Sequence, residues 1–511
     1  MSRRSTLPEP RPRAGARWVE LVAGTGLAAL LFTIYLDSPP GKLWDSQFAA
    51  LTSEAILEGE GFDLSRFLAG TAWEGPTAEH PAAELPWQLE RIEGRLVYLF
   101  PPGTPVLSLP LVAAARAAGF SSLDAARRYD SSRERRLQLL VASLLSALTA
   151  IVAFRLARHE VELRDALAIA LIAGLGSSLW TVASRELWSH TWSALLLGVG
   201  WLELLRWEEG KSRRAFVLGA IAGAAFWVRP SNAWIAVAWT VFVFVRYRRE
   251  TWRLVSSGAV ALGAYCLWSL HTSGALFPSY VRLSRPWTVG TFAHGLTAAL
   301  FSSHHGLFVY SPILLAAGYV LLRHGVPSSR RPLAILGAIL ILGHLGLHAA
   351  SGASWGPDGP RLQHDLVPIL AWFGAVAMRR QHELGKGLAA PRRGLRLASA
   401  AVLLTLAGAS ILASIGSVQV GQRMMGRYRA RLEASYPLWD LRRLPQYLGL
   451  RALGLADPLP AAKRAPRLAR GAPAEPTAPA APDCGGRAPP SGPRLQPQSA
   501  TVPRCELTCK R

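Results

Sequence analysis

A polar stretch that follows the first long apolar run carries the residues best suited to chemistry. Asp45 lies nine residues beyond Leu36, and Asp63 follows it in the same stretch. A carboxylate placed there can accept the proton of an attacking hydroxyl group, as a general base does. We therefore predict Asp45 as the catalytic base and Asp63 as a second-rank catalytic or donor-binding residue.

Further polar residues interrupt the later apolar runs, and their positions predict that all of them face the same side of a membrane. They are Glu186 and His190, Arg229, His304 and His305, and Asp358, Arg361, His364 and Asp365. Arginine and histidine side chains bind phosphate oxygens well. We predict donor-phosphate binding by the set Arg229, His304, His305 and Arg361, second-rank roles for Glu186 and His190, and a pocket lined by Asp358, His364 and Asp365.

A carboxylate base beside cationic groups suits transfer from a phosphate-activated donor, because phosphate is a good leaving group. Several alternatives remain open from the sequence. Glu186 and His190 are four apart and also fit a simple polar pair on one helix face. Arg229 also fits a lipid-headgroup anchor, and Arg361 a structural pair with Asp365. His344 and His348 read as buried polar links between helices.

The rest of the chain is organised as a membrane protein. It is 50% hydrophobic and only 17% charged, and its apolar runs of roughly 17–22 residues match the length that crosses ~30 Å of hydrocarbon. Backbone groups there must pair internally, which predicts an all-α polytopic bundle of about 11 transmembrane helices with a large first external loop. The net charge of +23 is concentrated in Arg-rich loops, which is typical of loops facing anionic lipid rather than of nucleic-acid binding.

These patterns predict six successive parts. They are a cytoplasmic Arg/Pro-rich tail (1–17), a first transmembrane helix (18–36), an external catalytic loop (37–136) with an amphipathic or re-entrant segment (104–120), a transmembrane core (137–418), an external tail that packs on the surface (419–449) and a disordered Pro/Ala-rich tail (450–511). The N-terminus is predicted to be cytoplasmic, and the active site and C-terminus external, because the alternating loops rich in Lys and Arg face the cytoplasm.

Five stretches in the region 18–380 together resemble the C-type glycosyltransferase superfamily. They are Trp44-Asp45 with EGEGFDL (58–64), FPPGTP (100–105), ELWSH (186–190), GLFVYSP (306–312) and GPDGPR (356–361). Within the superfamily they are similar to the bacterial protein O-mannosyltransferase and aminoarabinose-transferase branch. The resemblance implies a lipid-phosphate-linked sugar donor, Asp45 as the base, inversion at the anomeric carbon, and a place in the bacterial inner membrane.

Two classes of function remain in view. The first is a polyprenyl-phosphate-sugar-dependent glycosyltransferase with a glycan, lipid or protein acceptor, and the second is a lipid-linked-glycan transporter or flippase without catalysis. Spans nearly free of charge favour the enzyme, because a transporter places ionisable groups at mid-membrane. No bound cofactor and no nucleic-acid partner are expected. The sequence shows no metal-ligand spacing and leaves a divalent metal open, as it does a disulfide among Cys484, Cys505 and Cys509.

Overall fold

The computed structural model describes residues 14–76, 84–211, 213–282, 289–302, 306–350, 361–386, 393–419 and 445–453. All of them belong to one compact unit, Met1–Pro458. The predictions for His304, His305 and Asp358, and those for the tail beyond 453, lie outside these residues. Within them the chain is an all-α polytopic membrane protein with one small β-hairpin.

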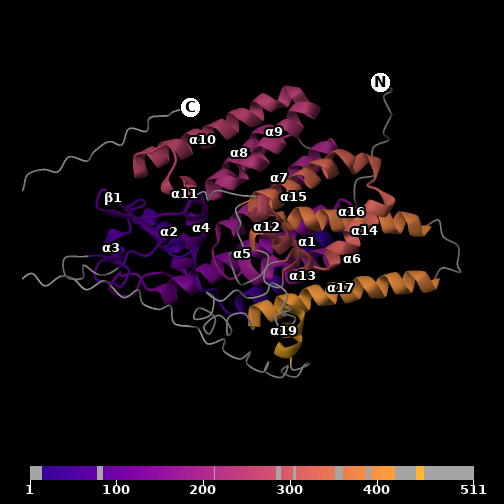
Figure 1. Ribbon diagram of the computed structural model, residues 1–511, viewed down its shortest axis with the longest axis horizontal. Coiled ribbons are helices and arrows are strands. Elements are labelled where there is room, and N and C mark those ends of the chain that lie inside the picture. The colour runs from indigo at the N-terminus through magenta and orange to yellow at the C-terminus, as the bar shows by residue number, and fades with distance from the viewer. Residues whose placement is uncertain are drawn as a thin grey trace, which may run out of the picture. The chain divides into compact units, whose positions relative to one another are not determined.

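The long helices follow one another through most of the described chain (Figure 1). In order they are α1 (Ala14–Leu36), α2 (Ala49–Leu57), α3 (Ser65–Leu68), α4 (Gly103–Ala117), α5 (Ser131–Arg158), α6 (Leu163–Leu175), α7 (Ser189–Glu208), α8 (Ala215–Val228), α9 (Ala233–Tyr247), α10 (Thr251–Ser273), α11 (Ser279–Arg282), α12 (Val289–Phe301), α13 (Leu307–Tyr310), α14 (Ile313–His324), α15 (Arg331–Ala350), α16 (Val367–Lys386), α17 (Arg393–Gln419) and α19 (Pro445–Ala452).

Among the described residues, five helical stretches are long and apolar enough to cross a membrane. They are Trp18–Leu36, Ser131–Arg158, Pro230–Ser273, Ser328–Ala350 and Ala401–Val418. This is fewer than the expected 11 because some predicted spans are broken and others are joined. The run at 165–183 divides into α6 and a π-helical turn, η1 (Leu179–Ala183), whereas the runs at 231–247 and 253–271 join through a 3-10 turn, η3 (Arg248–Glu250).

Helix α5 lies at the centre of the bundle and packs against α1, α6, α7 and α16. The largest side chains of the core are the tryptophans Trp201, Trp239 and Trp372, all fully buried. The ring of Trp239 reaches the backbone of α7 at Gly200, where an added Cβ would lie 2.1 Å from it. Glycine at this position therefore lets a large aromatic ring fill the space between helices.

The first polar loop folds into a small layer of its own, formed by α2, α3, α4 and a hairpin (Figure 1). Strand β1 (Leu89–Ile92) pairs antiparallel with β2 (Arg95–Tyr98). The two residues between them, Glu93 and Gly94, have φ angles of 49° and 83°, as a type I′ turn requires. No strand was predicted here from the sequence, although a two-residue turn between two short runs of alternating apolar and polar residues indicates a hairpin.

The segment expected to be amphipathic or re-entrant, 104–120, forms α4, which is 15 residues long. Such a helix measures about 22 Å, which is shorter than the hydrocarbon layer. It packs against α2, α5, α7 and α8. Its first residue, Gly103, meets the backbone of Trp227 and Val228, where an added Cβ would come within 2.3 Å. Close helix contact therefore fixes the start of α4 against the end of α8.

A buried ionic network joins the helix ends opposite to the Asp45 loop, and we call it the opposite-end network. Arg330 bridges Glu160 and Glu209, each at 2.7 Å. Arg379 reaches Glu160 at 3.1 Å, and His159 contacts Glu209 at 2.8 Å. The network ties together the α5–α6, α7–α8 and α14–α15 connections and α16.

Candidate active site

The backbone around Asp45 is held by one buried carboxylate from a distant part of the chain. Glu186 accepts hydrogen bonds from the backbone N–H of Lys42 at 2.7 Å and of Trp44 at 3.3 Å, and from the Ser46 hydroxyl at 2.9 Å. Glu186 is 2% exposed. Glu186 therefore holds the Asp45 loop, residues 41–47, and its second-rank role in catalysis or donor binding stays a prediction.

The backbone of the Asp45 loop packs directly against the side chain of Glu186 at Gly41. An added Cβ at Gly41 would lie 1.9 Å from Oε1 of Glu186, and the Gly41 N–H donates to the carbonyl of Arg185 at 3.0 Å. Leu43 in the same loop has a φ of 56°, which is uncommon for a residue with a side chain. The contacts with Glu186 and Arg185 hold the loop in this conformation.

Three more side chains fix the backbone next to Asp45. The hydroxyl of Tyr98 on β2 donates to the carbonyl of Asp45 itself. Gln138 on α5 donates to the carbonyl of Ser46 at 2.7 Å, and Gln88 donates to that of Trp44 at 3.0 Å. The position of Asp45 is therefore set by the hairpin, by α5 and by the connection before α7.

The carboxylate of Asp45 forms an ion pair with Nη2 of Arg361, 316 residues further along the chain. The guanidinium group lies over the ring of Trp188, 3.8 Å from its centroid, in a cation–π contact. The side chains of Arg361 and Asp45 are 18% and 26% exposed. Burial lowers the pKa of Arg361 to about 9, which still leaves it charged at neutral pH.

Three other predicted site residues, His190, Arg229 and Asp365, belong to a second buried cluster. It also contains His344 and His348, and we call it the His190 cluster. Arg229 pairs with Asp365, and its guanidinium lies 2.9 Å from Nδ1 of His190 and 3.3 Å from Nε2 of His348. The rings of His344 and His348 are 4.5 Å apart. These two histidines are buried polar links between helices, as the sequence predicts.

The charges of Arg229 and Asp365 in the His190 cluster offset each other. Burial raises the pKa of Asp365, but the charge of Arg229 and the contact with His190 outweigh it and hold the pKa well below its usual range. Asp365 is thus the counter-ion of Arg229. Arg361, the alternative structural partner of Asp365, pairs with Asp45 instead. Arg229 is 7% exposed, so it does not anchor a lipid headgroup.

The remaining described candidates lie apart from Asp45. Asp63 accepts hydrogen bonds from the N–H of Ser65 at 2.9 Å and from its hydroxyl at 2.6 Å, and so holds the first residue of α3. His364 contacts the Ser178 hydroxyl at 3.0 Å, next to η1, and is fully buried. Among the described residues, no group of three or more His, Cys, Asp and Glu side chains is arranged to hold a metal ion.

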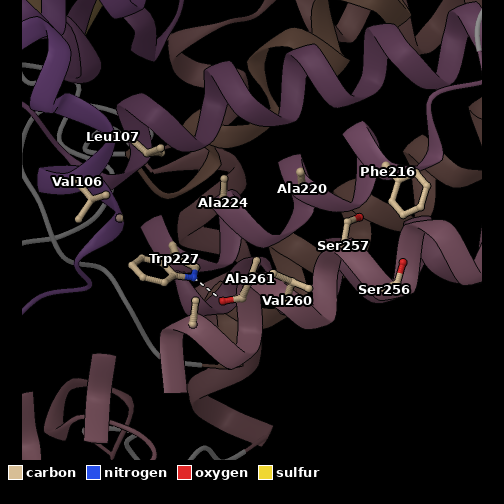
Figure 2. A pocket seen from close by; sticks show the side chains of 12 residues that line it. Val106, Leu107, Phe216, Ala220, Ala224, Trp227, Ser256, Ser257, Val260 and Ala261 are labelled. Carbon is tan, nitrogen blue, oxygen red and sulfur yellow. Dashed lines mark hydrogen bonds between the residues drawn. The ribbon is translucent and has the colours of Figure 1, made fainter. Parts of the chain in front are cut away.

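An apolar groove of about 600 Å³ runs between α4, α8 and α10 (Figure 2). Its walls include Val106, Leu107, Phe216 and Val260, and Figure 2 shows Trp227 donating its indole N–H to the carbonyl of Ala261. Trp227 at one end of the groove lies two residues before Arg229 of the His190 cluster. The end of the groove at Trp227 and Arg229 of the His190 cluster thus both lie at the C-terminal end of α8.

Two residues that position the site were not found from the sequence. Gln138 also accepts from the N–H of Leu187 at 3.0 Å, so it holds the loops on both sides of the site. Glu134, one turn earlier, accepts from the N–H groups of Phe48 and Ala50 at 3.0 and 3.1 Å. A signal was present in the sequence, because two polar side chains four residues apart, Glu134 and Gln138, share one face at the start of an apolar helix.

No protein-family model and no curated protein matches the chain. Solved structures do resemble it. The crystal structure of ArnT from Cupriavidus metallidurans in the apo state shares 15% identity, with a TM-score of 0.48 over 86% of this chain and 76% of that one. The same protein bound to undecaprenyl phosphate gives 14% identity and a TM-score of 0.44 over 86% and 78%.

The archaeal oligosaccharyltransferase AglB from Archaeoglobus fulgidus, in complex with an inhibitory peptide and a dolichol-phosphate, shares 12% identity. The TM-score is 0.43, over 84% of this chain and 61% of that one. At these identities and TM-scores, the activity proposed below rests on this chain's own residues.

Proposed function

We propose that this protein is an integral-membrane glycosyltransferase that moves a sugar from a polyprenyl-phosphate-linked donor to an acceptor hydroxyl. The observation that carries the proposal is the pair formed by Asp45 and Arg361 on Trp188. It places a proton acceptor directly beside a cation suited to phosphate, on the side of the bundle to which the α1 C-terminus and the α7 N-terminus lead. A carboxylate base and a phosphate ligand are the two groups this reaction needs.

In the proposed reaction, the acceptor hydroxyl attacks the anomeric carbon while Asp45 takes its proton. The bond between that carbon and the phosphate oxygen breaks, and the phosphate leaves with the electron pair. Arg361 holds the departing phosphate and offsets its charge. Because the hydroxyl enters opposite to the leaving group, the anomeric configuration inverts.

The polyprenyl chain of the donor is proposed to lie in the apolar groove between α4, α8 and α10. Apolar side chains line it, and it reaches the close contact of Gly103 with Trp227. A lipid tail bound there leaves its phosphate toward the polar ends of the helices. The acceptor binds from the aqueous face, which we infer to be the external face of a bacterial inner membrane.

The test is sugar transfer in isolated membranes supplied with a panel of radiolabelled polyprenyl-phosphate sugars and varied acceptors. Wild type is compared with Asp45→Asn, which keeps the shape of the side chain but cannot take the proton. A matched control is Asp124→Asn, whose carboxylate is in the same polar layer but contacts only Arg128. Transfer by wild type and the control, with none above background in Asp45→Asn at equal protein levels, supports the proposal. Equal transfer by Asp45→Asn would exclude it as the base.

A transporter of lipid-linked glycans is the second candidate, because the His190 cluster buries ionisable groups in the helix bundle. Its members nevertheless sit near the ends of α7, α8, α15 and α16 rather than at mid-helix. Movement of a labelled lipid-linked glycan across proteoliposomes, without sugar transfer from any donor to any acceptor, would favour this candidate over the enzyme.

A further inference from the structure

We propose that Arg361 is shared between Asp45 and the donor phosphate, so that Asp45 becomes available as a base only once the donor is bound. This inference rests on the proposed function and adds an order to it. In the free protein the guanidinium group neutralises the carboxylate. The phosphate then takes over the guanidinium and leaves the carboxylate free to accept the acceptor's proton.

The first support is the unused hydrogen-bonding capacity of Arg361. A guanidinium carries five N–H donors, and Asp45 is contacted through Nη2. Its Nε is buried and has no hydrogen-bond partner among the described residues. The group thus has room for a second anion without first losing every bond to Asp45, as a stepwise exchange requires.

The second support is the restraint that Trp188 places on Arg361. The indole ring is 5% exposed and covers one face of the guanidinium at 3.8 Å. A cation held on an aromatic face can turn in its own plane while it keeps that contact. The plane also contains the N–H donors, so a small rotation moves them from one anion to another. Trp188 is thus a positioning residue for Arg361.

The third support is that the backbone of Asp45 is held in place. The backbone at Asp45 is fixed by Tyr98 on one side and by Glu186 through the neighbouring residues. Arg361, at the start of η5 (Arg361–Leu366), holds Asp45 only through its side chain. The exchange therefore moves the arginine and leaves the base in place.

Chemistry favours the direction of the exchange. A phosphate offers more oxygens and more charge to the guanidinium fork than one carboxylate does. Phosphate cannot bind Arg361 while Asp45 holds it. The measured affinity for phosphate is therefore the intrinsic affinity multiplied by the fraction of time that Arg361 is free. A binding measurement can therefore detect the competition without any catalysis.

The experiment measures binding of undecaprenyl phosphate to the full chain in lipid nanodiscs, with four variants. Asp45→Asn removes the competitor, and we expect roughly tenfold tighter binding if Arg361 is engaged about nine-tenths of the time. Arg361→Gln removes the shared cation, and we expect at least roughly tenfold weaker binding. The double variant must bind no more tightly than Arg361→Gln alone, because Asp45 then has no cation to withhold from the phosphate. Asp124→Asn, in an exposed Asp–Arg pair of the same layer, must match wild type.

Each outcome separates the two proposals. If wild type binds but Asp45→Asn binds equally or more weakly, the sharing of Arg361 is wrong while the donor class stands. If Asp45→Asn gains affinity in the Arg361→Gln background as well, the gain is a general charge effect and the sharing is again wrong. If wild type and Asp124→Asn do not bind undecaprenyl phosphate at all, the proposed function fails. Thermal melting of every variant verifies that it is folded, and Asp45→Ser replaces Asp45→Asn if the latter is not, because it removes the same competing charge.

Discussion

Two ionic regions lie at opposite ends of the helices, and they differ in how fully their charges are used. In the opposite-end network, Arg330 sits between Glu160 and Glu209, and both carboxylates have further donors. At the other end, the Asp45–Arg361 pair is partly exposed, and Arg361 has a donor with no partner among the described residues. Arg330 thus lies between two carboxylates, whereas Arg361 faces one carboxylate among the described residues.

The difference teaches how to separate a structural ionic cluster from a site in a chain like this one. Both regions are rich in Arg and acidic residues, so residue types do not distinguish them. What distinguishes them is the aromatic platform under Arg361 and the greater exposure of its side chain, 18% against 9% for Arg330. Substitutions in the two regions should therefore change different measured quantities.

The largest expected effect is on stability, at the opposite-end network. Arg330→Met leaves Glu160 and Glu209 buried without their shared cation, which costs about 3–5 kcal/mol in the free energy of unfolding. Thermal denaturation in detergent should show a clear fall in the midpoint, while sugar transfer per folded molecule stays unchanged. Arg331→Met, at the exposed neighbouring position, is the control and should change stability by less than about 0.5 kcal/mol. A large loss of transfer per folded molecule would place Arg330 in the catalytic machinery instead.

The next effect is on the rate of transfer, through the loop that holds Asp45. Glu186→Gln keeps the size of the side chain but brings a donor group to a place where two backbone N–H groups and a hydroxyl already donate. A shift of Asp45 of about 1 Å should lower kcat roughly a hundredfold. The KM for the donor should stay near wild type, because the Glu186 carboxylate is bonded to the backbone and hydroxyl groups of the Asp45 loop.

The control for this prediction is Glu93→Gln, whose side chain is 83% exposed in the hairpin turn. It should leave kcat and KM unchanged. A Glu186→Gln variant that instead raised KM at constant kcat would assign Glu186 to donor binding.

A pH dependence follows for the opposite-end network. Burial raises the pKa of Glu209, but the contacts with His159 and Arg330 outweigh it and lower the pKa to about 2, from an ordinary value of about 4.5. A depressed pKa stabilises the fold above the unfolded value, so this contribution is lost as the pH falls from about 4.5 toward 2. Melting midpoints between pH 6 and pH 3 should fall less steeply for Glu209→Gln than for wild type. Parallel curves would contradict the assignment.

The smallest expected effect concerns the hydrogen bond from Tyr98 to the carbonyl of Asp45. Tyr98→Phe removes one hydrogen bond worth roughly 1 kcal/mol, so transfer should fall about fivefold. Initial rates at saturating donor measure it. Stability should change little, because the ring itself stays packed against Phe100, 5.4 Å away between centroids. An unchanged rate would show that Glu186 and Gln138 suffice to place Asp45.

The sequence was sufficient to predict the membrane-protein class and to bring together Asp45 and Arg361, because alternating sides of a helix bundle follow from the order of the apolar runs. It was not sufficient for the role of Glu186. A carboxylate that accepts from backbone N–H groups more than 140 residues away leaves no pattern in spacing. Nor did it separate Arg229 from Arg361, since only the fold shows that one has a buried counter-ion.

The hairpin has a consequence for how this protein can vary. Tyr98 pairs with Leu89 in the register set by the two-residue turn at Glu93 and Gly94. Because side chains alternate along a strand, a slip of one residue would send Tyr98 to the opposite face, away from Asp45, whereas a slip of two would keep the parity. Insertions and deletions in this hairpin that preserve activity should therefore contain an even number of residues. The two-residue turn thus limits how the length of the chain can vary here.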